Sequence, residues 1–408
     1  MSLKNRTSRI AGLFAVAVAA INLGCGGTGA PTSQKPSQPT ITATLTAGTA
    51  PVAVAVNTAT NQILVAGSGA PGGDPNDCSG APGTVTVIDG STTSTTGPVA
   101  VGNNGGPYPF AIAVDAASNT AYVLSRGHLI ADGQCFTDEP AKLIAVGGTL
   151  PSTSTVTGGV GKGQGGQNMA LNPVNNKLYV SDFIGNSVIV VDTTTNSVAN
   201  TIPLGFSPND VAVNPATNVI YVGGAGNFGI IDGATNALTT IADSDSAAQL
   251  AVNPTNNKIY ATNSGSNSIT VLDGATNSLA TVADPNAVSP CVIAINTTTN
   301  KIYVANSGSN NVTVIDGNTN SVTTVAAGTA PCGLAVDLAH NRVYVTNSGN
   351  SSGDPGSITV IDSATNSVAI LIDPKAVRPT AVAVDSVNSM IYVANNGSNN
   401  VTVIDGVQ

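Results

Sequence analysis

The chain has 408 residues and a formal net charge of −9, with 9% charged residues, 3% aromatic residues and no tryptophan. The excess of 22 acidic over 13 basic side chains repels phosphate backbones, which disfavours DNA and RNA as partners. Stability has to come from small aliphatic contacts and a complete backbone hydrogen-bond ladder, because aromatic anchors and ion pairs are scarce.

The first 40 residues have the composition of a leader and a tether. Residues 1–24 join a basic start to an apolar stretch that is short for a membrane span, as in a secretory signal peptide. Cys25 follows in a Leu-Gly-Cys context that resembles a bacterial lipobox, except that Asn22 stands where an apolar residue is preferred; ordinary cleavage near Ala19 is the alternative. Residues 25–40 are rich in Pro, Ser and Thr and predict a flexible tether. We expect an exported cell-envelope protein, in the periplasm or at the surface, that meets the membrane through a lipid anchor.

From residue 41 to residue 408 the chain consists of near-copies with a period of about 40 residues. Each copy opens on an apolar run that has an alanine at one fixed place: Ala55, Ala113, Ala170, Ala212, Ala251, Ala294, Ala335 and Ala383. A second run, of the type NKIYVAN, carries a tyrosine in seven of the eight copies: Tyr122, Tyr179, Tyr221, Tyr260, Tyr303, Tyr344 and Tyr392. A third run, of the type VTVIDG, ends on aspartate in seven copies, and a weaker fourth run follows.

These short runs predict β-strands, because they are rich in Val, Ile, Thr and Tyr and are bounded by Asn, Gly, Asp or Pro. Four strands per copy predict an all-β propeller, in which alanine suits the crowded axis and tyrosine fills the wider wedge between sheets. The last copy ends after its third strand, and Ile41–Pro51 matches the fourth strand and linker of the sixth copy. We therefore expect a single, monomeric domain over residues 41–408. It has eight blades, with seven as the alternative, and is closed by the N-terminal strand pairing with the last blade.

Where YVAN, YVTN and VIDG recur with this spacing, the chain resembles the YVTN-repeat β-propeller family over residues 41–408, and residues 344–347 match the motif literally. Members of that family are described as seven-bladed, whereas eight copies are present here. The resemblance implies an exported or cell-surface location and diverse binding roles, and it implies no catalytic set.

Four cysteines lie within the repeats, an even number that suits disulfides in an oxidising compartment. Cys78 and Cys135 fall in long second-to-third-strand insertions of adjacent blades, and Cys291 and Cys332 occupy equivalent places in the sixth and seventh copies. We expect the pairs 78–135 and 291–332, with four buried thiols as the alternative. No CxxC motif or nearby histidine supports metal binding, so no metal site is expected.

One candidate site is the rim on which the long insertions gather, since propellers place binding surfaces on such loops. The insertions span residues 67–83, 125–141 and 348–356. Their polar side chains include His128, Asp132 and Glu139, and the alternative is that they are solvated loops without a ligand.

The other candidate site is the mouth of the central channel, two residues before each fixed alanine. Copies three to five contribute a polar arc there, formed by Asn168, Asp210 and Gln249, while the other copies have small or apolar residues. These groups could coordinate an ion or a small ligand, or hold channel water.

The sequence favours a non-catalytic binding scaffold over an enzyme. We expect it to need no cofactor and to recognise an envelope protein, a polysaccharide or a small ligand. The alternative is a lactonase-like hydrolase or lyase with its site at the channel mouth. The histidines disfavour this alternative, because His128 has no evident partner and His340 falls in a turn on the opposite face.

Overall fold

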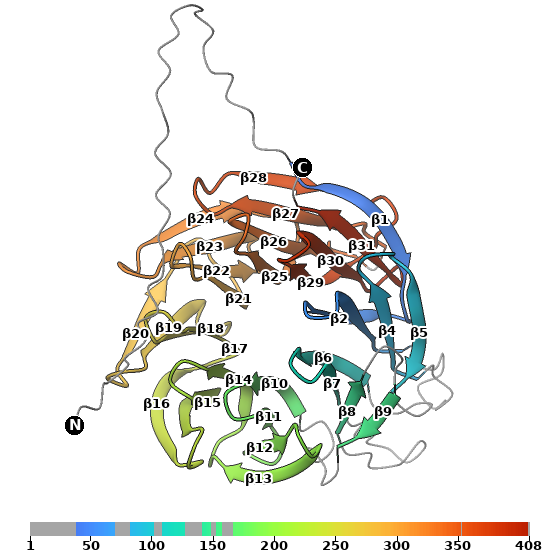
Figure 1. Cartoon of the computed structure of the whole chain (residues 1–408). Coiled ribbons are helices and arrows are strands. Elements are labelled where there is room, and N and C mark those ends of the chain that lie inside the picture. The colour runs from blue at the N-terminus through green and yellow to red at the C-terminus, as the bar shows by residue number, and fades with distance from the viewer. Residues whose placement is uncertain are drawn as a thin grey trace, which may run out of the picture. The chain divides into compact units, whose positions relative to one another are not determined.

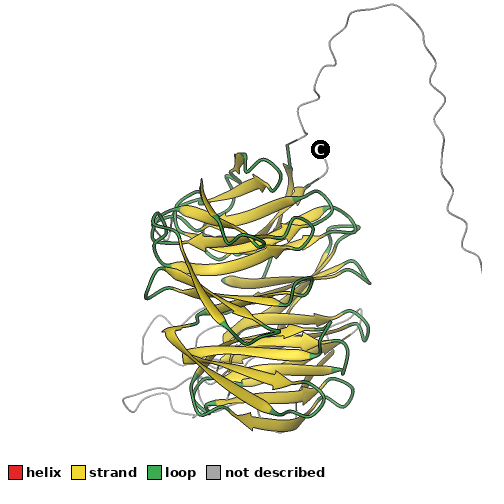
Figure 2. Cartoon of the chain, turned by 90° about the vertical axis from the view of Figure 1, so that its left-hand side faces the viewer, coloured by secondary structure: helices red, strands yellow, loops and turns green. Residues whose placement is uncertain are grey.

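The computed structural model describes residues 38–69, 82–101, 108–126, 141–147, 152–156, 166–351 and 353–406. Over these ranges it is an all-β protein whose eight sheets stand around a common axis as a propeller (Figure 1). The side view in Figure 2 shows strands and loops. Within the described residues, no helix is long and apolar enough to cross a membrane.

Blades 1 to 4 come from the first half of the chain. Blade 1 contains β2 (Pro51–Asn57), β3 (Gln62–Gly67), β4 (Thr84–Asp89) and β5 (Thr95–Ala100). Blade 2 contains β6 (Tyr108–Asp115), β7 (Thr120–Arg126), β8 (Lys142–Gly147) and β9 (Ser152–Thr155). Blade 3 contains β10 (Gly166–Asn172), β11 (Lys177–Asp182), β12 (Ser187–Asp192) and β13 (Ser197–Pro203). Blade 4 contains β14 (Pro208–Asn214), β15 (Val219–Asp232) and β16 (Leu238–Ser246).

Blades 5 to 8 repeat the pattern more regularly. Blade 5 contains β17 (Gln249–Asn253), β18 (Lys258–Asn263), β19 (Ser268–Asp273) and β20 (Leu279–Ala283). Blade 6 contains β21 (Pro290–Asn296), β22 (Lys301–Asn306), β23 (Asn311–Asp316) and β24 (Val322–Ala326). Blade 7 contains β25 (Pro331–Asp337), β26 (Arg342–Asn347), β27 (Ser357–Asp362) and β28 (Val368–Leu371). Blade 8 contains β29 (Pro379–Asp385), β30 (Met390–Asn395), β31 (Asn400–Asp405) and β1 (Thr40–Thr46).

Strand β15 of blade 4 is 14 residues long and occupies the places of the second and third strands of the other blades. Its first half pairs with β14 and its second half pairs with β16. Gly226, where the pairing of β15 passes from β14 to β16, has a φ of +66°, a conformation that glycine adopts without steric cost. The sheet of blade 4 thus has three strands in the order β14-β15-β16, and β15 spans the places of the second and third strands of the other blades.

The ring closes as the sequence predicts. Strand β1 pairs antiparallel with β31, in a register that sets Thr40 opposite Asp405 and Thr46 opposite Asn400. The innermost strands contact one another in succession around the axis, and β29 of blade 8 contacts β2 of blade 1. The prediction of eight blades sealed by the N-terminal strand is confirmed.

The two faces of the ring have different connections. We call the rim that carries the second-to-third-strand loops and the blade linkers the loop face, and the opposite rim the turn face. On the turn face, seven of the first-to-second-strand turns hold an asparagine with positive φ: Asn61, Asn119, Asn176, Asn218, Asn257, Asn300 and Asn341. Asparagine tolerates this left-handed conformation better than other residues with a side chain. Blade 8 departs from the rule, with Ser389 at φ 59°.

Buried amide pairs join neighbouring blades on the turn face. At five boundaries the asparagine that ends the first strand donates Nδ2–H to Oδ1 of the left-handed asparagine in the next blade. The pairs are Asn57–Asn119 at 2.6 Å, and Asn172–Asn218, Asn214–Asn257, Asn253–Asn300 and Asn296–Asn341 at 2.7 Å. The donor residues are at most 2% exposed, so each pair satisfies polar groups that burial would otherwise destabilise.

The seven second-strand tyrosines fill the wedges between blades, as the sequence predicts, and each is at most 1% exposed. Tyr122 packs with Leu178 and Val180 of the next blade. Its hydroxyl lies 2.8 Å from Asn196 Oδ1 and 3.2 Å from Thr193 O. The hydroxyl of Tyr392, in contrast, is buried without a hydrogen-bond partner among the described residues.

This contrast gives a paired prediction for two Tyr→Phe variants. Tyr122→Phe should lower the free energy of unfolding by about 1 kcal/mol, because acceptors in the blade boundary lose their donor. Tyr392→Phe should be neutral or slightly stabilising, because it removes a buried polar group that gains nothing in the folded state. Chemical denaturation followed by circular dichroism measures the free energy of unfolding of both variants. Equal decreases would mean that the two tyrosine hydroxyls do not differ in hydrogen bonding.

Candidate functional site

The predicted channel-mouth residues lie at the loop-face ends of the innermost strands of blades 3, 4 and 5. Asn168 in β10 donates Nδ2–H to Asp210 Oδ1 in β14 over 2.6 Å. The backbone N–H of Val211 donates to the same oxygen over 2.8 Å, and the backbone N–H of Leu250 in blade 5 donates to Asp210 Oδ2 over 2.6 Å. Asp210 therefore links three consecutive blades.

Burial changes the acidity of Asp210. The residue is 3% exposed, and desolvation raises its pKa to about 7 although the three hydrogen bonds oppose the shift. A carboxyl group that titrates near neutrality can serve as a general acid or base. Both oxygens, however, already accept hydrogen bonds between blades, so the observed contacts make this group a structural link.

Gln249, the third predicted residue, begins β17 of blade 5. Its backbone N–H donates to Thr262 Oγ1 over 3.1 Å, and the residue is half-buried. The structure thus brings Asn168 and Asp210 into contact, and Gln249 connects to them through the backbone of its neighbour Leu250.

The predicted loop-face residues His128, Asp132 and Glu139 lie outside the described residues. The same holds for Cys25, and for Cys78 and Cys135 of the first predicted disulfide.

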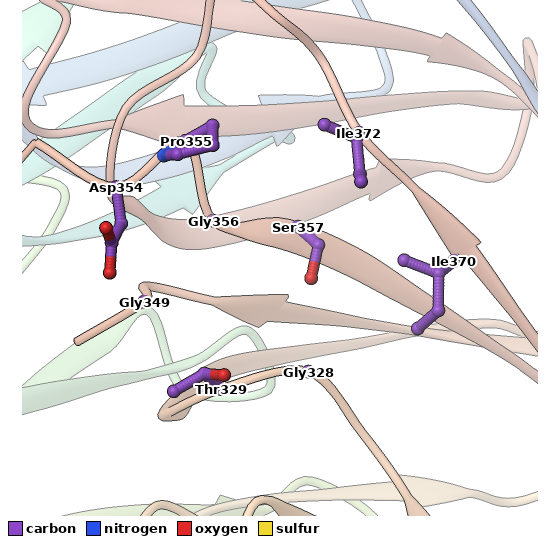
Figure 3. A pocket seen from close by; sticks show the side chains of 9 residues that line it. All are labelled: Gly328, Thr329, Gly349, Asp354, Pro355, Gly356, Ser357, Ile370 and Ile372. Atoms are coloured by element: carbon purple, nitrogen blue, oxygen red, sulfur yellow. The ribbon is translucent and has the colours of Figure 1, made fainter.

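The insertion over residues 348–356 forms the side of a pocket of about 280 Å³ beside blade 7 (Figure 3). Asp354 and Thr329 lie at one end of this pocket, Ile370 and Ile372 lie at the other, and Ser357 lies between them. We call this the blade-7 pocket. Its lining residues come from the linker before β25, the loop between β26 and β27, and the outer end of the blade.

The two ends of the blade-7 pocket differ in chemistry. Asp354 accepts hydrogen bonds from the backbone N–H groups of Asn350 and Ser351 and from Ser351 Oγ, which lower its pKa and keep the carboxylate ionised. At the other end, Ile370 and Ile372 are 48% and 58% exposed, which is unusual for isoleucine. The pocket can therefore accept a group with a hydrogen-bond donor at one end and an alkyl part at the other.

Sequence reasoning flagged the insertion but missed the two isoleucines. The sequence does contain a pattern that points to them. The apolar residues Val368, Ile370 and Ile372 alternate along the outermost strand of blade 7 and the residue after it, on an edge that faces solvent.

The predicted disulfide between Cys291 and Cys332 is not formed, and both residues are free thiols. Each side chain points the same way around the ring: Cys291 Sγ donates to Pro331 O and Cys332 Sγ to Pro379 O, both over 3.4 Å. Thr380 makes the equivalent bond to Pro51 O over 3.3 Å. Each thiol thus lies against backbone carbonyls of its own blade and of the next, and burial raises the pKa of both, which makes them poor nucleophiles.

Over the described part of the chain, no three His, Cys, Asp or Glu side chains come together in a way that could hold a metal ion.

Among known proteins, residues 224–323 match the family model described as "Lactonase, 7-bladed beta-propeller". The matched segment runs from the second half of β15 in blade 4 to the start of β24 in blade 6, which is less than half of the chain. No curated protein matches the sequence. The match supports a β-propeller repeat, and the eight observed blades differ from the seven that the family description gives.

Proposed function

We propose that the loop face of the protein is a non-catalytic recognition surface, through which the protein binds its partner. The observation that carries this proposal is the blade-7 pocket, which opens beside an insertion of this face and pairs an ionised carboxylate with two exposed isoleucines. Buried amide pairs at five blade boundaries and a closed ring give such a surface a rigid support, which lowers the entropy lost on binding. The ligand group has a hydrogen-bond donor or an amine near Asp354 and a short alkyl part over the isoleucines.

A binding experiment with a defined probe tests this proposal. Hexylamine carries both features, and its titration should shift the amide NMR signals of Gly328 and Gly349, which line the pocket. Ile372→Asp should weaken binding at least about tenfold, because a charge in an apolar contact costs more than 1.4 kcal/mol.

The matched control is Val387→Asp, which also replaces an exposed aliphatic side chain with aspartate, at a position that is 69% exposed on the turn face. It should leave hexylamine binding unchanged. Equal weakening by both variants, or no shift at the pocket glycines in the unmodified protein, would contradict the proposal.

A second candidate function is lactonase-like hydrolysis, favoured by the family match over residues 224–323. Asp210 is then the group to test, since its pKa of about 7 suits proton transfer. The purified protein is incubated with a panel of lactones, and ring opening is followed by acid release. Turnover that Asp210→Asn abolishes would support this function over the binding module.

We also propose that the chain is exported and lipid-anchored at Cys25, with residues 25–40 as the tether. Metabolic labelling with palmitate, comparing the natural chain with Cys25→Ser, tests the anchor. Label retained in the variant would refute it.

A further inference from the structure

At the boundary between blades 7 and 8, three side chains on the turn face form an Asp–His–Ser series. Asp337 ends β25, His340 lies in the turn that follows, and Ser389 lies in the turn between β29 and β30. His340 Nδ1 is 2.8 Å from Asp337 Oδ2, and His340 Nε2 is 3.5 Å from Ser389 Oγ.

This boundary differs from the five that hold amide pairs. Asp337 stands where those boundaries have the donor asparagine, and Ser389 stands where the next blade has the left-handed asparagine. An amide pair cannot form between an aspartate and a serine at these places. The imidazole of His340 spans the boundary instead.

The hydrogen bonds of Asp337 determine which nitrogen of His340 carries the proton. Asp337 is fully buried, and its Oδ1 accepts the backbone N–H groups of Ala339 over 3.0 Å and His340 over 3.2 Å. Its Oδ2 is left as an acceptor for the ring, so Nδ1 is the donor. The unprotonated Nε2 then faces the hydroxyl of Ser389, which is the arrangement of a general base beside a nucleophile.

Ser389 has a φ of 59°, in the left-handed region that the equivalent turns of the other blades also adopt and that serine adopts rarely. The residue is half-buried and the His340 side chain is 28% exposed, so both can be reached from solvent. The 3.5 Å separation is long for a hydrogen bond, and such catalytic contacts tighten when substrate binds.

A cation is anchored at the same boundary. Gly406 donates its N–H to Ser389 O over 2.8 Å, and Arg342 Nη1 donates to Gly406 O. Gly406 thus links the guanidinium of Arg342 to the backbone of Ser389, which adds a positive charge to this boundary.

We propose that Ser389 is a nucleophile, activated by His340 and oriented by Asp337, that acts on small, unhindered carboxylic esters. Ser389 Oγ forms a bond to the carbonyl carbon while His340 Nε2 takes the hydroxyl proton. The ester C–O bond then breaks, and the proton passes to the leaving alcohol. Water attacks the resulting acyl-serine by the reverse proton path, which releases the carboxylic acid and restores the hydroxyl.

The test is covalent labelling with a fluorophosphonate probe, followed by peptide mapping. The expected result is an adduct on Ser389. Ser289 is the matched control within the chain, because it also has a positive φ, of 54°, but lies at the loop-face end of blade 6, far in the fold from His340. It should remain unlabelled.

Three variants separate catalysis from a structural role. His340→Gln should slow labelling of Ser389 by about 100-fold, the scale of general-base assistance, and Asp337→Asn should slow it by disturbing the imidazole tautomer. Ser389→Asn should abolish labelling while keeping the fold, because asparagine suits the left-handed position in seven other blades. Labelling of Ser289 as fast as Ser389, no adduct on Ser389, or an unchanged rate in a folded His340→Gln protein would overturn the proposal.

Discussion

Removal of residues 1–46, which deletes β1, should lower the free energy of unfolding by on the order of 5 kcal/mol and produce soluble aggregates. Strand β1 supplies the outer hydrogen-bonded partner of β31 along its whole length. Leu45 packs against the buried cluster that contains Tyr392 and Val401. Thr44 Oγ1 donates over 2.8 Å to the carboxylate of Asp373, a residue that is 3% exposed. The deletion leaves that carboxylate short of a donor and presents β31 as an unpaired edge.

Removal of residues 1–37 is the control, since it leaves β1 intact. This shorter deletion should match the full chain in urea denaturation and in size-exclusion elution. If both deletions behave alike, the N-terminal strand does not hold the ring closed.

The stability of the protein should depend on pH through Asp210. Its folded-state pKa of about 7 lies above the unfolded value of 3.8, so the folded state binds the proton more tightly. The stabilisation is fully present below about pH 4 and is lost as the pH rises to about 7. The shift corresponds to about 4 kcal/mol of unfolding free energy.

The measurement is the difference in unfolding free energy between the natural protein and Asp210→Asn across this pH range. Other titrating groups cancel in the difference, so the natural protein should lose up to about 4 kcal/mol relative to the variant between pH 4 and pH 7.5. A difference that stays constant with pH would mean that the three N–H donors outweigh burial and keep Asp210 ionised throughout. Asp354→Asn provides a control whose difference from the natural protein should stay nearly constant over this range, because the pKa of Asp354 is lowered and the group titrates at more acidic pH.

The repeat made the fold predictable, because position within a copy determines position within a blade. Tyrosine in the second strand is buried in every copy that has one, and the match of Ile41–Pro51 to a fourth strand identified the closing pair. The burial of the tyrosines and the closing strand pair depend on strand periodicity and side-chain volume, and both can be read from a single sequence.

The candidate sites were less predictable, because they depend on side-chain direction. Cys291 and Cys332 occupy equivalent positions, and equivalent side chains point the same way around a ring, so proximity in the fold did not bring the two sulfurs together. Asn168 and Asp210 were expected near each other and are in contact, but the burial of Asp210 between blades depended on the position of the Leu250 backbone. The contact of His340 with Ser389 joins turns of two blades, and their separation in sequence gave no sign of it.

The closing strand has a consequence for biosynthesis. Thr42 Oγ1 donates to Val403 O, a bond between residues 361 positions apart. A ribosome therefore finishes seven blades before the partner of the earliest strand has been translated. Until then Leu45 and its neighbours have no sheet to join, so the nascent chain carries an unpaired apolar strand, which premature termination would leave without its partner.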